Sequence, residues 1–378
     1  MNDPSAIEVK YLKGIGLSLL VFTVLVLLTW VALFLDVDMK VSAFFFNKNT
    51  GWIYKDILPI RALYLFGTMP GLALTLTALS ITFLGFIQPK WREYQKQMLV
   101  IVLTTILGAG VLVNGILKPY CGRPRPREVT AFNGQWEFCS PCFNDAPGKG
   151  LSFPCGHCTM GFLFVTLIYL RRKSPVIAYG GAVFGVFYGI LMGIARAAQG
   201  AHFVTDTLWS FGVLVIVSLL LYYSLIPKIE RSWLKARTLS PRQIFVTGIC
   251  VALLMGGITL GFLTRRPYYE MTTRQLTLPT SVKQIIVHSN VALVNRTIDY
   301  KNKPTVVALL SQGFGWPDAE ELVEIIFNIK DDILNLEIVT TQDGYFAELQ
   351  HQLFLTLPAT SKNQINVFIE SDKAPDLN

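Results

Sequence analysis

The stretch LSLLVFTVLVLLTWVALF, residues 17–34, contains no charged side chain. A helix needs about 20 mostly apolar residues to cross a bilayer, and a charge-free run of this length is typical of such a span. The composition agrees, because 52% of the 378 residues are hydrophobic and only 15% are charged, which is too apolar for an ordinary soluble protein. The sequence therefore predicts an integral membrane protein.

Seven apolar stretches qualify as membrane spans or come close, and the fourth would need polar residues at its start to cross. No small-residue cleavage site follows the first stretch, so we interpret it as a retained anchor rather than a removed signal peptide. The expected fold is an all-α membrane core of six helices followed by a seventh transmembrane helix. The predicted spans are roughly 14–35, 62–87, 98–117, 157–170, 175–195, 203–226 and 243–263.

The net charge of +8 lies largely in alternate loops of the chain. Basic residues precede the first span and recur in every second loop after it, for example at Lys10, Arg92, Arg171 and Arg231. The positive-inside rule places all of these loops in the cytoplasm. Membrane topology thus accounts for the basic residues, and we expect no nucleic-acid partner.

The same topology places the loops at 36–61, 118–156 and 196–202 on the outer side of the membrane, with everything after the seventh span. The loop at 36–61 is rich in aromatic residues, which suits the membrane–water interface.

Residues 264–378 differ in composition from the rest of the chain and predict a small soluble α+β domain outside the membrane. A helix is expected to begin at Pro317-Asp318, where acidic residues occupy the first turn. Strand-like runs occur at Lys283–His288, Asn335–Thr341 and Gln364–Ile369. The expected organisation is a cytoplasmic N-terminus (1–13), a six-span membrane domain (14–226), a cytoplasmic loop with the seventh span (227–263) and the outer domain (264–378).

Five of the six cysteines fall at the outer face, where thiols tend to be oxidised and disulfides are expected. The spacing C-x2-C-x12-C-x2-C also resembles a four-thiolate zinc site, and Cys155-Gly156-His157-Cys158 has the form of a thiol–disulfide redox motif. From the cysteines alone, all three alternatives stay open. The candidates for disulfides are Cys121, Cys139, Cys142, Cys155 and Cys158.

Charged and titratable residues stand at the ends of several predicted spans, and all of them fall at the outer face. Charged groups at membrane depth are costly, so each is a functional hypothesis by default. Lys118 ends the third span and Arg196 ends the fifth, while His157 begins the fourth. His202 and Asp206 begin the sixth. Their common location predicts one site.

The residue types of this site predict phosphoryl transfer without a metal. His202 and Asp206 are four residues apart, so on a helix they share one face, and the carboxylate can fix the imidazole tautomer. The other ring nitrogen is then a nucleophile, and His157 can protonate the departing oxygen. Cations suited to phosphate oxygens stand nearby, and Gly156 at a helix N-terminus can offer backbone N–H groups. These cations are Lys118, Arg196 and the arginines of segment 123–127.

Three motifs at these residues resemble the type 2 phosphatidic acid phosphatase family. Lys118–Pro126 matches the pattern KxxxxxxRP, which makes Arg125 the motif arginine. Pro154–His157 resembles PSGH, and Ala195–Asp206 resembles SRxxxxxHxxxD. The resemblance covers roughly residues 14–226, in the family's order and spacing.

This resemblance implies a six-helix membrane core that dephosphorylates lipid phosphates or diphosphates. His202 would form a phosphohistidine, Asp206 would orient it, and His157 would be the general acid. Phosphate would be bound by Lys118, Arg125 and Arg196, with Cys155 and Gly156 beside them. No cofactor is implied.

Two residues depart from the family's pattern, since Cys155 and Ala195 each replace a serine. A thiol is a weaker hydrogen-bond donor than the hydroxyl, so rate and substrate fit could differ while the reaction type survives. A disulfide from Cys155 to Cys121, Cys142 or Cys158 would tie the motifs together or rigidify the loop. A thioredoxin-like site needs a βαβ setting, which the flanking sequence does not supply.

The expected protein is a lipid phosphatase in a bacterial inner membrane, with its site and outer domain in the periplasm. The expected substrates are lipid A phosphate, undecaprenyl diphosphate or phosphatidylglycerophosphate, with a mild preference for lipid A by analogy. The alternatives are a lipid phosphotransferase with the same phosphohistidine, a membrane thiol oxidoreductase, or a catalytically silent scaffold. The protein partner of the outer domain stays open, and we assign no role to His288 and His351.

Overall fold

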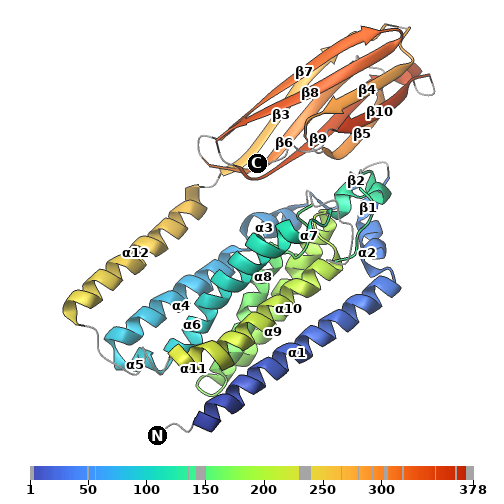
Figure 1. The fold of residues 1–378 in the computed structure, drawn as a ribbon. Coiled ribbons are helices and arrows are strands. Elements are labelled where there is room, and N and C mark those ends of the chain that lie inside the picture. The colour runs from blue at the N-terminus through green and yellow to red at the C-terminus, as the bar shows by residue number, and fades with distance from the viewer. Residues whose placement is uncertain are drawn as a thin grey trace. The chain divides into compact units, whose positions relative to one another are not determined.

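The computed structural model contains two compact units. The helical unit comprises 1–47, 52–126 and 136–256, and the β unit comprises 48–51, 127–135 and 257–378 (Figure 1). The described residues are 4–48, 51–55, 57–134, 136–141, 150–229, 240–264, 266–279, 281–291, 293–301, 305–316, 319–344, 346–361 and 364–371.

Long apolar helices dominate the first half of the chain. The helical elements are α1 (Pro4–Phe34), α2 (Val37–Phe45), α3 (Leu58–Phe66), α4 (Met69–Ile87), α5 (Pro89–Arg92), α6 (Gln95–Leu103), η1 (Thr104–Leu117), α7 (Lys118–Cys121), α8 (Gly156–Phe162), η4 (Leu163–Leu170), α9 (Pro175–Ala198), α10 (Val204–Leu220), η5 (Leu221–Leu225), α11 (Ile226–Ile229) and α12 (Pro241–Thr264). The short elements β1 (Phe46–Asn47), β2 (Gly51–Trp52), η2 (Pro126–Glu128) and η3 (Thr130–Phe132) lie between them.

Five helical segments of the described chain are long and apolar enough to cross a membrane: Glu8–Phe34, Leu58–Ile87, Gln95–Glu128, Pro175–Ala198 and Val204–Ser224. They correspond to the first, second, third, fifth and sixth predicted spans. The fourth predicted span forms the shorter apolar helix Gly156–Leu170, as its composition indicated. The seventh lies within α12, and its crossing of the membrane stays a prediction.

Small residues allow α9 to pack closely against α8 and η4. Gly181, Gly185 and Gly189 recur every four residues along α9, which places them on one face of the helix. A β-carbon at Gly189 would lie 2.2 Å from the Phe162 ring, and one at Gly185 would lie 2.6 Å from the backbone nitrogen of Val165. Close backbone approach through small residues is the usual packing mode of membrane helices. This contact fixes α8, which carries His157, against α9, which carries Arg196.

The β unit is built from two four-stranded sheets, with strand orders β10-β4-β8-β7 and β3-β6-β9-β5 (Figure 1). Apolar side chains from both sheets form one buried core, which includes Ile285, Leu336 and Leu353. The strands are β3 (Arg266–Leu276), β4 (Gln284–Ser289), β5 (Leu293–Lys301), β6 (Thr305–Gly315), β7 (Glu320–Lys330), β8 (Ile333–Asp343), β9 (Phe346–Pro358) and β10 (Asn366–Ser371). The three strand-like runs of the sequence coincide with β4, β8 and β10 and are confirmed.

The prediction of a helix beginning at Pro317-Asp318 is wrong, and so is the prediction that the domain after the seventh span is of the α+β class. Those two residues lie outside the described part of the chain, and strand β7 begins at Glu320. It pairs antiparallel with β8 through a turn in which Asp331 and Asp332 have φ of 50° and 62°. Such a turn favours a hairpin, and the ladder overrides the helical pattern of acidic residues. Within the described parts of 266–371, the elements are strands and one 3-10 turn, Ala359–Ser361.

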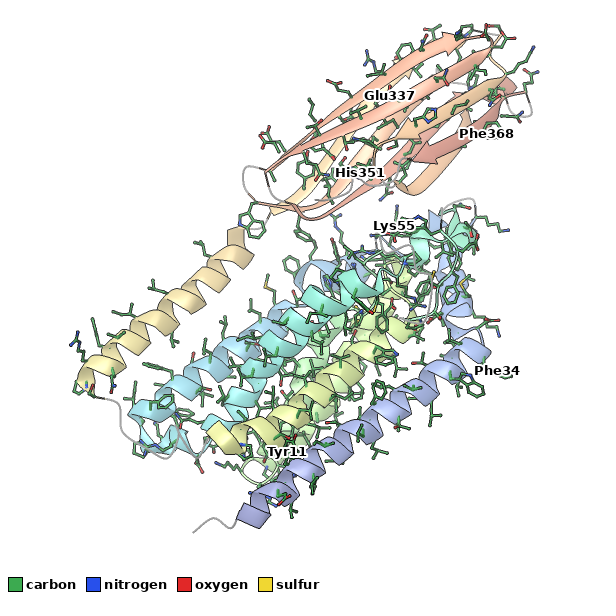
Figure 2. The ribbon with its side chains drawn as sticks, viewed as in Figure 1. Tyr11, Phe34, Lys55, Glu337, His351 and Phe368 are labelled. Carbon is green, nitrogen blue, oxygen red and sulfur yellow. The ribbon has the colours of Figure 1, made fainter. Side chains whose placement is uncertain are left out.

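A buried ion pair joins the two sheets of the β unit. His351 of β9 (Figure 2) donates from Nε2 to Glu321 Oε1 of β7 at 2.7 Å, and both side chains are buried. Burial raises the pKa of the Glu321 carboxyl. The hydrogen bond and charge supplied by His351 lower that pKa, and together with the other hydrogen bonds they outweigh burial, so the pKa lies below its usual value. The pair therefore stabilises the fold above the unfolded-state pKa of about 4.3, and the contribution is lost as pH falls through the lowered pKa.

We expect E321Q to weaken the β unit by about 2 kcal/mol at pH 6, because it removes a charged hydrogen-bond partner. Hydrogen exchange of peptides from β7 and β9 in the full-length protein measures this local stability, normalised to the chemical exchange rate. The wild type should open more readily at pH 3 than at pH 6, and E321Q should show a shallower change. The control is Asp332→Asn in the exposed Lys283–Asp332 pair, which should have little effect. Equal pH dependence of E321Q and wild type would contradict the assignment.

Candidate active site

His202 lies in a short buried turn between α9 and α10. Gly200 makes this turn with φ of +62°, where a β-carbon would strike the Trp52 ring at 2.1 Å. The helix α10 begins at Val204, so His202 precedes it, and the expectation that His202 and Asp206 share one helix face is wrong. Asp206 is instead the third residue of the helix, and its carboxylate accepts from the backbone N–H of Phe203 at 2.8 Å. Part of the hydrogen-bonding capacity of the Asp206 carboxylate is therefore used at the start of α10.

The closest partner of His202 is the backbone of the loop that carries the second motif. His202 Nδ1 lies 2.7 Å from the carbonyl oxygen of Ser152, whereas its distance to Asp206 Oδ2 is 3.5 Å. A carbonyl oxygen can only accept, so Nδ1 carries a proton, and in the neutral imidazole the lone pair is then on Nε2. The Ser152 hydroxyl donates to Asp206 Oδ2 at 2.5 Å. Ser152 thus connects the imidazole and the carboxylate with its two oxygens.

The loop residue Cys155 caps α8 and borders both histidines. Its sulfur accepts from the backbone N–H of Cys158 at 3.4 Å, the role that a serine or threonine often has at a helix N-cap. The same sulfur lies within electrostatic reach of His202 and His157. The backbone of Cys155 donates to the carbonyl oxygen of Asp206 at 3.3 Å. The second and third motifs therefore meet at this residue.

Lys118 reaches this loop from the end of the third long helix. That helix changes to π-type hydrogen bonding over η1, and such a segment frequently marks a functional site. A β-carbon at Gly156 would lie 2.6 Å from Asn114 Oδ1 and 3.3 Å from Lys118 Nζ. Only a glycine leaves this room, so the absence of a side chain at Gly156 lets the ammonium approach the N-terminus of α8.

Tyr64 of α3 lies between His157 and Arg196. Its ring stacks on the imidazole of His157 at a centroid distance of 5.6 Å, and the Arg196 guanidinium lies 4.7 Å from the ring centroid. Arg196 is buried, and it donates to Gln199 Oε1 at 2.7 Å. The aromatic ring therefore orients one candidate acid and one candidate phosphate-binding cation.

The family model of the PAP2 superfamily matches residues 98–230, which contain all three motifs. We call these residues the PAP2 segment. It is similar to the lipid A 4'-phosphatase of Francisella tularensis subsp. novicida (strain U112), with 35% identity over 136 residues. It is also similar to the lipid A 4'-phosphatase of Rhizobium leguminosarum, with 29% identity over 134 residues.

These matches cover 35% and 34% of this chain and 60% and 55% of the two relatives. The chain thus spans less than two thirds of the length of either relative. Among solved structures, none matches this chain. The similarity to the family therefore concerns the PAP2 segment, while α1 to α5, α12 and strands β3 to β10 lie outside it.

The structure connects most of the predicted site residues of the PAP2 segment. His202, Asp206, His157, Cys155, Gly156, Lys118 and Arg196 are linked by the contacts above. Arg125 lies on the loop after α7 with a half-buried side chain. Sequence reasoning missed Ser152, Asn114, Tyr64 and Asp38, which occupy no position of the three motifs. Ser152 lies two residues before Pro154, in the stretch that carries the second motif. It acts through its backbone carbonyl and its hydroxyl, and no sequence pattern predicts those two contacts.

The cysteine predictions are partly wrong. Cys121 is disulfide-bonded, but Cys139, Cys155 and Cys158 are free thiols, so a disulfide from Cys155 is not formed. Cys142 lies outside the described residues. The sulfurs of Cys155 and Cys158 contact each other at 2.7 Å, and both residues are fully buried. Among the described residues, no three His, Cys, Asp or Glu side chains form a group that could hold a metal.

Proposed function

We propose that the protein is a membrane lipid phosphatase that forms a phosphohistidine on His202. The carrying observation is the bond from His202 Nδ1 to the Ser152 carbonyl, which assigns the role of nucleophile to Nε2 inside the cluster of motifs. The PAP2 segment and its similarity to two lipid A 4'-phosphatases support the same chemistry. An amphiphilic substrate suits a site at the ends of apolar helices, because its tails stay in the bilayer.

In the proposed reaction, His202 Nε2 attacks phosphorus and forms the P–N bond. The bond to the lipid oxygen breaks, and His157 gives its proton to that oxygen. His157 then takes a proton from water as the water oxygen attacks phosphorus, the P–N bond breaks with its electron pair returning to His202 Nε2, and inorganic phosphate leaves. Lys118, Arg125 and Arg196 neutralise the phosphoryl oxygens throughout, while Gly156 offers its backbone N–H. Tyr64 keeps His157 and Arg196 in their relative positions.

Substrate and location follow by analogy with the relatives. We infer a lipid of the bacterial envelope, with lipid A first among the candidates, then undecaprenyl diphosphate and phosphatidylglycerophosphate. We also infer a multi-pass protein of the inner membrane, with site and β unit in the periplasm, because basic loops alternate on the opposite side. The burial of Cys155 and Cys158 weighs against thiol exchange, which needs an accessible sulfur.

The test is phosphate release by the purified protein in detergent, with EDTA present. The panel contains lipid A, undecaprenyl diphosphate, phosphatidylglycerophosphate and phosphatidic acid. We expect release from at least one, with lipid A fastest. Transfer of label to a second lipid without free phosphate would instead identify a phosphotransferase. No turnover of any panel lipid by folded protein would contradict the proposal.

A further inference from the structure

Arg123 is the most completely buried cation of the site, although the motif arginine is Arg125. Its side chain has no exposed surface, and it uses all three nitrogens as donors. Nε donates to the Cys139 carbonyl oxygen at 2.9 Å. One terminal nitrogen donates to Asp206 Oδ1 at 2.5 Å and to Thr205 Oγ1 at 2.8 Å, and the other donates to Asp38 Oδ2 at 2.9 Å. The fork therefore bridges two carboxylates.

Asp38 enters the site from α2, which lies outside the PAP2 segment. Its carboxylate is buried, and both of its oxygens accept hydrogen bonds. Oδ1 accepts from the backbone N–H of Thr205 at 2.9 Å, and Oδ2 accepts from Thr205 Oγ1 at 2.5 Å as well as from Arg123. Asp38 thus holds the first turn of α10, the helix that presents Asp206 to His202.

The charges of Asp38, Arg123 and Asp206 stabilise one another because all three side chains are buried away from water. A buried ion costs several kcal/mol unless it is paired and hydrogen-bonded. Asp38 and Asp206 would repel each other without the guanidinium between them. The rings of Phe203 and Phe138 flank that guanidinium at 4.2 and 5.4 Å from their centroids, which excludes water and fixes its plane.

We propose that Asp38 and Arg123 are positioning residues for His202, acting through Asp206 and Ser152. Arg123 occupies Asp206 Oδ1, which directs Oδ2 to the Ser152 hydroxyl, and the Ser152 carbonyl holds His202 Nδ1. The charge network Asp38–Arg123–Asp206 therefore sets the tautomer and direction of the imidazole through two residues, Asp38 and Arg123, that the three motifs do not specify. This inference rests on the proposed role of His202 as the nucleophile.

The test measures kcat and KM on whichever of lipid A, undecaprenyl diphosphate, phosphatidylglycerophosphate or phosphatidic acid the wild type hydrolyses. We expect Arg123→Met to lower kcat about 100-fold, since a misplacement of about 1 Å has that effect. KM should change less than about threefold, because Lys118, Arg125 and Arg196 remain. Arg123→Lys keeps the charge but not the fork, and should restore about a tenth of wild-type kcat.

A double variant separates positioning from general destabilisation. Arg123→Met leaves two unpaired buried carboxylates, while Asp38→Asn alone turns an amide donor toward the guanidinium. In the double variant the amide introduced at position 38 no longer faces a cation, and one of the two negative charges is gone. We therefore expect the double variant to exceed Arg123→Met in kcat by about fivefold or more, although it carries one more substitution.

The outcomes separate the inference from the function on which it rests. Activity retained by folded His202→Ala would overturn the proposed function. An inactive His202→Ala, with Arg123→Met and Asp38→Asn both within twofold of wild-type kcat, would overturn the inference alone. So would a double variant that shows the product of the two single losses. If Arg123→Met does not fold, Arg123→Lys and Asp38→Asn decide by the same kcat criterion, with melting temperature as the folding control.

Discussion

His202→Ala should lower phosphate release by at least about 1000-fold, because it removes the nucleophile rather than a binding contact. The measurement is inorganic phosphate release in detergent with EDTA. The wild type mixed with a substrate carrying labelled phosphate should also retain an acid-labile, base-stable label on the protein. His202→Ala should retain none. The turn should tolerate the change, since the Ser152–Asp206 bond does not involve the imidazole.

His288→Ala is the matched control, because His288 lies on β4 outside the PAP2 segment. It should stay within twofold of the wild type. The role of His157 is tested with a substrate whose leaving group needs no proton. His157→Ala should lose far less activity on an aryl phosphate than on the lipid. A folded His202→Ala protein that keeps more than a tenth of wild-type activity would show that another group attacks phosphorus.

Gly189→Val should be among the most destabilising single substitutions in the helical unit. Its first side-chain carbon would lie 2.2 Å from the Phe162 ring, at the contact between α9 and α8. The helices would have to separate, and overpacking of this kind costs about 3 kcal/mol. The melting temperature in detergent should fall by about 6–12 °C. Activity should fall too, because the displaced helix α8 carries His157 and the capping thiol of Cys155.

Gly180→Val provides the control on the same helix. A β-carbon at Gly180 meets nothing within 4 Å, so the substitution adds the same side chain without a clash. Its melting temperature should lie within about 2 °C of the wild type. Equal effects of the two substitutions would mean that glycine acts through helix propensity and not through packing. A melting temperature of Gly189→Val close to the wild type would contradict the close contact itself.

The helical half of the protein could be predicted well from local sequence. Whether a segment such as residues 17–34 enters a membrane depends on the summed transfer free energy of its own residues, which composition determines. The same holds for recognising the three motifs, because their residue types and spacing lie in the sequence before any contact is known. The similarity of residues 98–230 to the PAP2 superfamily is visible in the order and spacing of the motifs.

The helix expected after Pro317 shows where local reasoning fails. The run Glu320–Lys330 has acidic residues where a helix start would have them, yet it pairs with Ile333–Asp343 as a hairpin. The alternating burial of its first half and the two positive-φ aspartates of the turn depend on the partner strand. A hydrogen-bonded ladder and a shared apolar core outweigh propensities of a few tenths of a kcal/mol per residue.

The sequence by itself determined the membrane class and the candidate residues of the site, His202 as candidate nucleophile among them, because these depend on residue type and spacing. Only the tertiary structure decided which oxygen holds His202 Nδ1, that Cys155 and Cys158 stay thiols, and that Asp38 and Tyr64 belong to the site. The physical reason is that hydrogen bonds and ion pairs require contact within about 3 Å. Segments as distant in sequence as Asp38 and Thr205 reach that distance only when the helices pack.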